Sequence, residues 1–473
     1  MIEFSIGEDP EVERKTVKDW KTFSWPKYQK TTEKVLNTLI EKWQNEQTNA
    51  LDMAQQLTDA LTEVADELLS EKTICKHSKP WIDTEIIEKL REQRAAKKNW
   101  KRRRSPRNYE KYTELVDQTE KIISEAKDRW WTAEIKRLEE APQEKKWKIL
   151  DRITNRQLRM GIQPVKVDGS YVFSDEEILE QMEKVHVRKG DCSNDVNEDL
   201  VNNLQLDIET ARNQCIEDDD DDLHNTMITI DEVESTFGKC SNTAGSDGIT
   251  AAMIDNAHRE KMTECLHFLW NSIWTENKIP AQWKLENRKL IPKASKESYN
   301  ECEAYRTVSI TALLGKRLEK IISARLTCCL EIQEFDENQF AYLKGRSSTQ
   351  AVLKLVEEAK RNMHQKCVTG VLFFDFSDAF GTVNRAKLLY KLRTHFNVSG
   401  RLFLYLVSFL TERKARITVN DLIGEWIESD HGTSAGTILG AILFLVYVHD
   451  TPSGIQPKFA DDLAASVSGK DVA

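Results

Sequence analysis

The apolar run VTGVLFFDF at residues 368–376 constrains the fold more than any other part of the sequence. Such a nearly continuous run of β-branched and aromatic residues is typical of a strand that is buried on both faces. We therefore expect a buried strand, followed by a helix that starts at Ser377 and Asp378 and continues through residues 387–389. Asp375 stands near the end of the run. A carboxylate there is costly to bury unless it caps a helix or meets a cation.

A second acidic feature is the pair Asp461 and Asp462, which follows Phe459 and Ala460. Two adjacent carboxylates repel each other, and a tight turn between strands would hold both in the same small space. That arrangement becomes favourable when divalent cations bind there, since magnesium prefers hard oxygen ligands. An Asp–Asp pair alone is weak evidence, because exposed loops contain many. Together with Asp375 it indicates a metal site.

Residues 20–156 show the three- and four-residue periodicity of amphipathic helices, for example at Leu57, Leu61, Val64 and Leu68. The stretch has no glycine, and its few prolines are therefore the predicted helix boundaries. These are Pro26, Pro80, Pro106 and Pro142.

Tryptophans and basic residues are concentrated in this helical stretch. Eight of the twelve tryptophans precede residue 150, and residues 97–104 read KKNWKRRR. The tryptophans favour filling of the seams between helices, with base stacking beside the arginines as the alternative. The basic segment has two interpretations, a nucleic-acid contact or a solvated helix face.

The pattern changes after residue 160. Val165, Val167, Tyr171 and Phe173 alternate around Asp168-Gly169, which predicts a short hairpin. The acidic run at residues 217–222 has no periodicity and is expected to be an exposed linker. We therefore divide the chain into an α-helical region at 1–160, a hairpin, helix and acidic linker at 161–230, and an α/β domain at 231–473.

Bulk composition does not decide the function. The net charge of −10 disfavours nucleic-acid binding only mildly, because local fields act on a phosphate backbone. The nine cysteines form no Cys-x-x-Cys pair, so a zinc site is not expected. The sequence has neither a signal peptide nor an apolar run long enough for a membrane span. We expect an intracellular protein, in the nucleus or the cytoplasm, that is neither secreted nor transmembrane.

Seven short motifs follow one another from residue 243 onwards. They are AGSDGI (244–249), WK with IPK (283–284 and 291–293), YRTVSI (305–310), QFAYLKGRSST (339–349), FDFSDAF (374–380), HGTSAGT (431–437) and FADD (459–462). In this order the sequence resembles the reverse transcriptases of non-LTR (LINE-type, jockey-like) retrotransposons. The resemblance covers about half of the chain. It implies an α+β fold, with the fingers and palm of a right-hand polymerase after a mostly α-helical N-terminal region.

The resemblance implies an RNA-directed DNA polymerase that adds deoxynucleotides to a DNA primer on an RNA template. Asp375, Asp461 and Asp462 would hold two Mg²⁺ ions, with help from the main-chain carbonyl of Phe376. Two metals stabilise the attacking and the leaving oxygen of nucleotidyl transfer.

Further residues match nucleotide-contacting positions of the family. Lys293 and Arg306 would grip the triphosphate. Phe380 would lie under the sugar and exclude a 2′-hydroxyl, although helix packing is its simpler role. Ala435 and Gly436 would form the turn beside the nucleotide. The expected nucleic-acid contacts are Arg346 together with Lys101, Arg102, Arg103 and Arg104.

Three departures from the family pattern lead us to expect weak or absent polymerisation. Ala435 replaces a glutamine, Gly381 replaces an aspartate after the first catalytic motif, and the sequence stops before the helical thumb of the family. Two alternatives stay open at this point. One is a non-catalytic nucleic-acid-binding relic of such an element, and the other is a helical scaffold for protein interactions.

Overall fold

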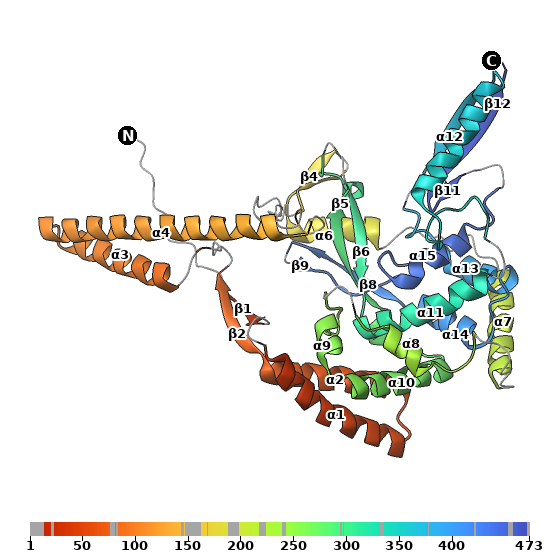
Figure 1. Ribbon diagram of the computed structural model, residues 1–473, viewed down its shortest axis with the longest axis horizontal. Helices are drawn as coiled ribbons and strands as arrows, with labels where there is room; N and C mark the ends of the chain where they lie inside the picture. Colours follow the sequence, from red (N-terminus) through yellow and green to blue (C-terminus); the bar gives the residue numbers. More distant parts are fainter. Residues whose placement is uncertain are drawn as a thin grey trace. The chain divides into compact units, whose positions relative to one another are not determined.

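The computed structural model describes residues 14–19, 23–75, 81, 84–142, 146, 162–167, 169–187, 198–216, 224–238, 243–293, 296, 298–331, 335–376, 378–420, 422–452 and 457–470. The chain divides into two compact units (Figure 1). The first, which we call the hairpin unit, combines Met1–Phe23 with Leu69–Gly161. The second, the core unit, combines Ser24–Leu68 with Ile162–Ala473.

The hairpin unit contains two long helices and a strand pair. Helices α3 (Thr84–Arg102) and α4 (Pro106–Glu140) pack against each other. Ser105 caps α4, because its side chain accepts a hydrogen bond from the backbone N–H of Asn108. Strand β1 (Arg14–Asp19) pairs antiparallel with β2 (Ser70–Cys75). The prediction of helix throughout residues 20–156 is therefore wrong at β2, whose partner strand lies outside that stretch.

Tryptophans of the hairpin unit lie in aromatic clusters. Trp100, near the end of α3, is 5.3 Å from Tyr109 and 5.8 Å from Tyr112 of α4, measured between ring centroids. Trp130 lies 5.7 Å from Trp81 and 5.0 Å from Trp131. These contacts support the interpretation that the rings fill seams between elements.

Helices α1 (Trp25–Asn45) and α2 (Ala50–Leu68) belong to the core unit, although they were expected to join the N-terminal helical region. Both pack on α10 (Arg259–Glu276). The backbone N–H of Ala50 donates to the Glu276 carboxylate at 2.8 Å. The expected division of the chain at residue 160 therefore does not coincide with the division into compact units. The reason is that α10, a helix far along the chain, covers the apolar faces of α1 and α2.

The predicted hairpin near residue 168 is confirmed. Strand β3 (Val165–Val167) pairs antiparallel with β4 (Ser170–Val172), and Gly169 adopts a positive φ of 86° in the turn. The elements that follow are α6 (Asp175–His186), α7 (Glu198–Ile216), α8 (Ile230–Ser235) and α9 (Ala251–Asn256). The acidic run at 217–222 lies outside the described residues.

A five-stranded sheet forms one part of the core unit. Its strands are β5 (Leu285–Pro292), β6 (Tyr305–Ile310), β8 (Lys414–Val419), β9 (Leu422–Ile423) and β10 (Ile427–Glu428). The order is β10–β8–β5–β6, with β9 also paired to β8. Strand β5 runs antiparallel to β6 and parallel to β8. The 3₁₀ turns η2 (Ala281–Lys284) and η3 (Cys302–Ala304) precede β5 and β6.

Helices with buried apolar side chains complete the core beside this sheet. They are α11 (Leu313–Glu331), α13 (Arg385–Thr394), α14 (Gly400–Leu410) and α15 (Ile438–Tyr447). The predicted helix start at Ser377–Asp378 is wrong. Asp378 adopts a left-handed φ of 51°, and α13 begins only at Arg385, where the Asn384 side chain accepts the backbone N–H of Lys387. No helix in the described ranges is long and apolar enough to cross a bilayer.

The strand that directly precedes Asp375 belongs to a separate three-stranded sheet. Strand β12 (Asp462–Gly469) lies between β11 (Lys458–Phe459) and β7 (Val368–Phe374), with α12 (Ser348–His364) alongside (Figure 1). The expected burial of both faces is wrong, because successive residues of a strand point to opposite faces and two neighbours in β7 are both exposed. Leu372 is 66% exposed and Phe373 is 76% exposed.

Candidate active site

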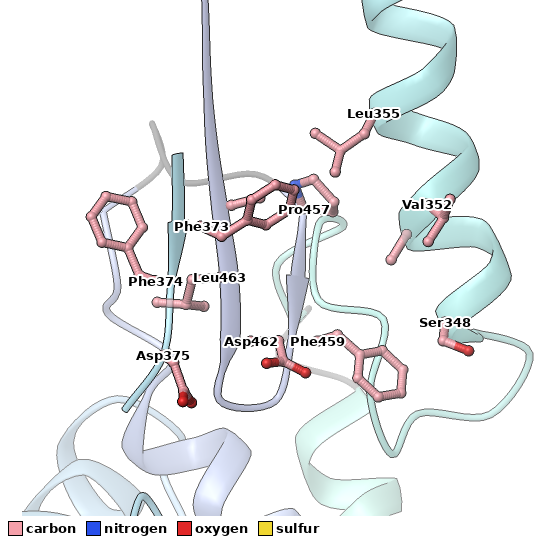
Figure 2. A pocket seen from close by; sticks show the side chains of 12 residues that line it. Ser348, Val352, Leu355, Phe373, Phe374, Asp375, Pro457, Phe459, Asp462 and Leu463 are labelled. Carbon is pink, nitrogen blue, oxygen red and sulfur yellow. The ribbon is translucent and has the colours of Figure 1, made fainter. Parts of the chain in front are cut away.

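Asp375 and Asp462 lie at the same end of the three-stranded sheet. Strands β7 and β12 are antiparallel, and Phe374 is the partner of Leu463. One step further along the two strands are Asp375 and Asp462, and Figure 2 shows both carboxylates at this end of the strands. Opposite residues of an antiparallel pair have Cβ atoms about 5 Å apart. Strand pairing therefore brings together carboxylates that are far apart in the sequence.

The pKa of Asp461 depends on both Asp375 and Asp462. Burial raises the pKa of Asp461, and the negative charges of Asp462 and Asp375 raise it further. The positive charge of Arg306 acts in the opposite direction and lowers it. Like charges at such separations are unfavourable unless a cation compensates them. The three aspartates thus form one electrostatic cluster with Arg306 beside it.

A pocket of about 370 Å³ opens beside this cluster (Figure 2). Its walls come from α12, β7, β12 and the segment before β11, with Val352, Leu355, Phe373 and Pro457 among the apolar contributors. Asp375 and Asp462 are the charged groups of the lining. The carboxylates therefore border a largely apolar space next to an exposed sheet edge.

The donor chemistry of the cluster fits a divalent cation. Three carboxylates supply only hard oxygen ligands, which magnesium prefers and which leave positions for phosphate oxygens. Within the described ranges, however, no three His, Cys, Asp or Glu side chains are gathered closely enough to hold a metal ion. Asp375 and Asp462 are exposed, whereas Asp461 is half-buried.

Lys293 and Arg306 lie at one end of the β5–β6 pair. Lys293 follows β5, and its backbone N–H donates to the carbonyl of Ala304 at 2.8 Å. Arg306 stands opposite Ile291 and is exposed. The positive charge of Arg306 acts on the pKa of Asp461. Arg306, the predicted triphosphate contact, therefore interacts electrostatically with the carboxylate cluster.

Phe380 has aromatic neighbours on two sides. Its ring stacks on Phe444 of α15, with centroids 4.6 Å apart, and meets the edge of Tyr342 at 6.4 Å. The structure therefore gives Phe380 the packing role that sequence reasoning considered the simpler one. Its ring is half-buried.

The Ala435–Gly436 turn is held against strand β6. The backbone N–H of Ser309 donates to the carbonyl of Ala435 at 2.7 Å. Gly436 has a φ of 106°, and a Cβ atom added to it would lie 2.7 Å from the carbonyl oxygen of Ser309. Glycine is therefore required at this position both by the backbone conformation and by the close approach of β6.

A buried carboxylate, Glu286, lies beneath this turn. It accepts hydrogen bonds from Arg413 at 2.7 Å, from Ser309 at 2.9 Å and from Ser434. Burial alone would raise the pKa of Glu286, but the charges of Arg413 and Arg288 and the hydrogen bond from Ser434 hold it well below its usual range. The turn is thus anchored to a charged network that sequence reasoning did not identify.

Arg346 is engaged by its own chain. One terminal nitrogen of its guanidinium donates to the carbonyls of Asp336 and Gln339, each at 2.6 Å. Part of its hydrogen-bonding capacity therefore stabilises the loop before α12. The other predicted nucleic-acid contacts, residues 101–104, belong to the hairpin unit, where they end α3 and connect it to α4 with exposed side chains.

Tyr342 and Gln339 are site residues to which sequence reasoning gave no role. Tyr342 has a left-handed φ of 55°, is 56% exposed and contacts Phe380. Burial and the charge of Asp461 raise the pKa of Tyr342. Gln339 forms an isolated β-bridge with Lys458 of β11. Both belong to the motif at 339–349, and membership of that motif is the sequence feature that could have identified them as site residues.

Residues 291–473 match the family model described as reverse transcriptase (RNA-dependent DNA polymerase). The chain is similar to the RNA-directed DNA polymerase from mobile element jockey of Drosophila melanogaster, with 24% identity over 265 residues, or 52% of this chain and 28% of that protein. It is also similar to the probable RNA-directed DNA polymerase from transposon X-element of the same species, with 24% identity over 273 residues, 54% of this chain and 30% of that protein. The chain therefore spans less than a third of the length of these curated relatives.

Among solved structures, apo telomerase from Candida tropicalis, truncated from its C-terminal domain, has 13% sequence identity and a TM-score of 0.29. That likeness covers 43% of this chain and 49% of the telomerase chain. Telomerase from the same species with a fragment of telomeric RNA has 11% identity and the same TM-score of 0.29, over 52% of this chain and 51% of that one.

Proposed function

We propose that this chain, which carries a reverse transcriptase domain of the non-LTR retrotransposon type, performs nucleotidyl transfer onto the 3′-hydroxyl of a DNA primer on an RNA template. The observation that supports the proposal most strongly is the position of Asp375 and Asp462 on neighbouring strand ends, with Asp461 in the field of both. In this proposal residues 231–473 form the fingers and palm.

The three aspartates would hold two Mg²⁺ ions, and the main-chain carbonyl of Phe376 would supply a further oxygen. Bound magnesium provides charge stabilisation for the attacking and leaving oxygens of the phosphoryl group. The chain itself contributes the geometry. Strand pairing between β7 and β12 fixes the separation of Asp375 and Asp462, and the turn before β12 positions Asp461.

The incoming deoxynucleotide would lie between the carboxylates and strand β6. Arg306 would neutralise part of the triphosphate charge, because it lies close enough to act electrostatically on Asp461. Lys293 would add a second positive charge from the end of β5. The Ala435–Gly436 turn would lie along the nucleotide. Phe380 is held by Phe444, so its ring would present a fixed surface to the sugar.

Nucleic acid would be bound by cations outside this centre. Residues 101–104 form an exposed basic segment, and Arg346 retains guanidinium nitrogens beyond the one that bonds to the loop. Phosphate contacts of this kind supply sequence-independent affinity that weakens as salt rises.

A second candidate function is nucleic-acid binding without catalysis. Ala435 favours it, because a methyl group stands where the family has a side-chain amide that contacts nucleotide and template. Loss of one such hydrogen bond corresponds to about 1–3 kcal/mol, or roughly a ten- to hundredfold loss of rate.

Primer extension on an RNA template with Mg²⁺ distinguishes the two candidates. If the chain is a polymerase, it extends the primer, extension requires the metal, and Asp461→Asn abolishes it. Tight binding of the primer–template without extension would favour the non-catalytic candidate. Extension that persists in Asp461→Asn would contradict the metal assignment.

A further inference from the structure

The side chain of Gln339 lies against the turn that carries Asp461. Its amide oxygen accepts two backbone N–H groups, that of Ala341 at 3.0 Å and that of Ala460 at 3.1 Å. Gln339 is 4% exposed. A buried acceptor with two donors is a fixed point of the structure, because removing it would leave both N–H groups without a partner away from water.

The turn itself has an unusual backbone. Phe459 pairs with Asp462, so Ala460 and Asp461 form a two-residue loop between β11 and β12. Ala460 adopts a left-handed φ of 55° and is buried. A residue with a Cβ atom seldom adopts this conformation, and it persists where the surroundings determine it. The bond from Ala460 to Gln339 fixes the peptide plane that leads into this residue.

Main-chain hydrogen bonds hold the segment around Gln339 against the same hairpin. The backbone N–H of Phe340 donates to the carbonyl of Lys458 at 2.9 Å, and the N–H of Lys458 donates to the carbonyl of Asn338 at 2.8 Å. The side chain of Lys458 also donates to Asp336 at 2.8 Å. Gln339 is therefore carried by a short extended segment that is in register with β11.

The electrostatics of the cluster create a need for such an anchor. The negative charges of Asp462 and Asp375 act unfavourably on Asp461, so the turn that carries these carboxylates requires support from elsewhere in the chain. A hydrogen bond from the turn to a buried, uncharged acceptor supplies that support and adds no negative charge. A carboxylate at this position would add to the repulsion.

We propose that Gln339 is a positioning residue, whose amide oxygen fixes the backbone of Ala460 so that Asp461 and Asp462 stay beside Asp375. The inference rests on the proposed function, since it assigns Gln339 to the same metal centre. Gln339 touches no reacting atom in this arrangement. It acts through the orientation of the aspartates, as groups behind metal ligands do.

The test compares Gln339→Met, which removes the acceptor and keeps the size, with Gln350→Met, the same change at an exposed glutamine of α12 directly after the motif. Mn²⁺ binding is measured by electron paramagnetic resonance, and kcat and the nucleotide KM by primer extension. We expect Gln339→Met to weaken Mn²⁺ binding about tenfold or more and to lower kcat about ten- to hundredfold. KM for the nucleotide should change less than about twofold, because triphosphate contacts are untouched. Gln350→Met should match the parent.

Mn²⁺ affinity and kcat of Gln339→Met equal to those of the parent would overturn the positioning role and leave the proposed function intact. A parent chain that binds Mn²⁺ no better than Asp461→Asn would refute the metal centre itself, and with it the proposed function. If Gln339→Met does not fold, Gln339→Asn decides, because it keeps a neutral amide but shortens the side chain by one methylene, so that its oxygen is drawn back from the backbone N–H of Ala460. A loss of Mn²⁺ affinity of about tenfold or more supports the inference, and affinity within about threefold of the parent contradicts it.

Discussion

The positive charge of Arg306, on strand β6, opposes the rise in the pKa of Asp461 that burial and the charges of Asp462 and Asp375 cause in the turn between β11 and β12. This relationship links the two larger sheets among the described residues of the core unit, since β6 belongs to the five-stranded sheet and β12 to the three-stranded sheet. Arg306, which suits a triphosphate, and Asp461, which suits a metal ion, therefore interact electrostatically although they belong to different sheets. The proposed site depends on this convergence.

Gly436→Ala should disrupt the turn beside the proposed nucleotide position. The new Cβ atom would lie 2.7 Å from the carbonyl oxygen of Ser309, at a φ of 106°. Strain of this kind costs about 1–3 kcal/mol, so the urea midpoint and the primer-extension rate should both fall. Gly370→Ala is the control, because a Cβ atom there meets nothing within 4 Å. Equal stability of both variants would contradict the packing of this turn.

Glu286→Ala should destabilise the core unit strongly. The change removes the carboxylate that pairs with Arg413 and leaves buried cations uncompensated, which costs about 3–5 kcal/mol. Because the folded pKa of Glu286 lies below the unfolded one, its stabilisation is present above the unfolded pKa and is lost as pH falls through the folded value. Urea unfolding measures the effect.

Glu180→Ala provides the comparison for Glu286. Glu180 pairs with Lys184 at 2.8 Å, and both side chains are at least half exposed. An exposed pair contributes at most about 1 kcal/mol. Similar losses in the two variants would mean that the Glu286 network does not stabilise the fold.

Asp247→Asn should stabilise the chain at neutral pH. Burial raises the pKa of Asp247 to about 6. Between the unfolded value and this one, the folded state binds more protons, so stability falls as pH rises from about 4 to about 6 and stays lower above. The neutral amide removes this loss, which amounts to at most about 3 kcal/mol.

Thermal unfolding at pH 5 and pH 7 checks this prediction, with the exposed Glu63→Gln as control. The parent and the control should lose the same stability between the two pH values, and Asp247→Asn should lose less. An identical pH dependence in all three would show that Asp247 titrates as an exposed carboxyl group does.

Replacement of Arg102, Arg103 and Arg104 by Ala should flatten the salt dependence of RNA binding. Each phosphate contact on single strands contributes about 0.7 to the slope of log K against log salt, so the slope should fall by about 2. Lys27, Lys30 and Lys34 on α1 are exposed, and their replacement by Ala makes the same change of charge elsewhere. Equal slopes for the two triple variants would mean that residues 102–104 are simply solvated.

Local patterns in the sequence predicted the local structure well. Pro26 and Pro106 stand in the first turns of α1 and α4, and α4 ends at Glu140, before Pro142. The apolar run after the HGTSAGT motif forms α15. These features depend on capping, backbone restriction and periodicity, which are properties of neighbouring residues.

Features that depend on distant partners could not be predicted in the same way. The apolar run at 368–376 has the composition of a buried strand, but its exposure depends on which distant segments cover the two faces of β7. The partners of Glu286 come from β6 and from residues 413 and 434. The role of Gln339 depends on a bond to Ala460 that no local pattern contains.

The central claim is that Asp375, Asp461 and Asp462 act as one metal centre, and single-nucleotide incorporation by Asp375→Asn, Asp462→Asn and their double variant tests it most directly. Groups that act as a unit are not additive. Each single variant should lose at least about a hundredfold in rate, and the double variant should lose no more than the worse single one. Asp430→Asn, in the loop after β10, should keep the parent rate. Single variants that retain near-parent rates, or losses that simply multiply in the double variant, would contradict a shared centre.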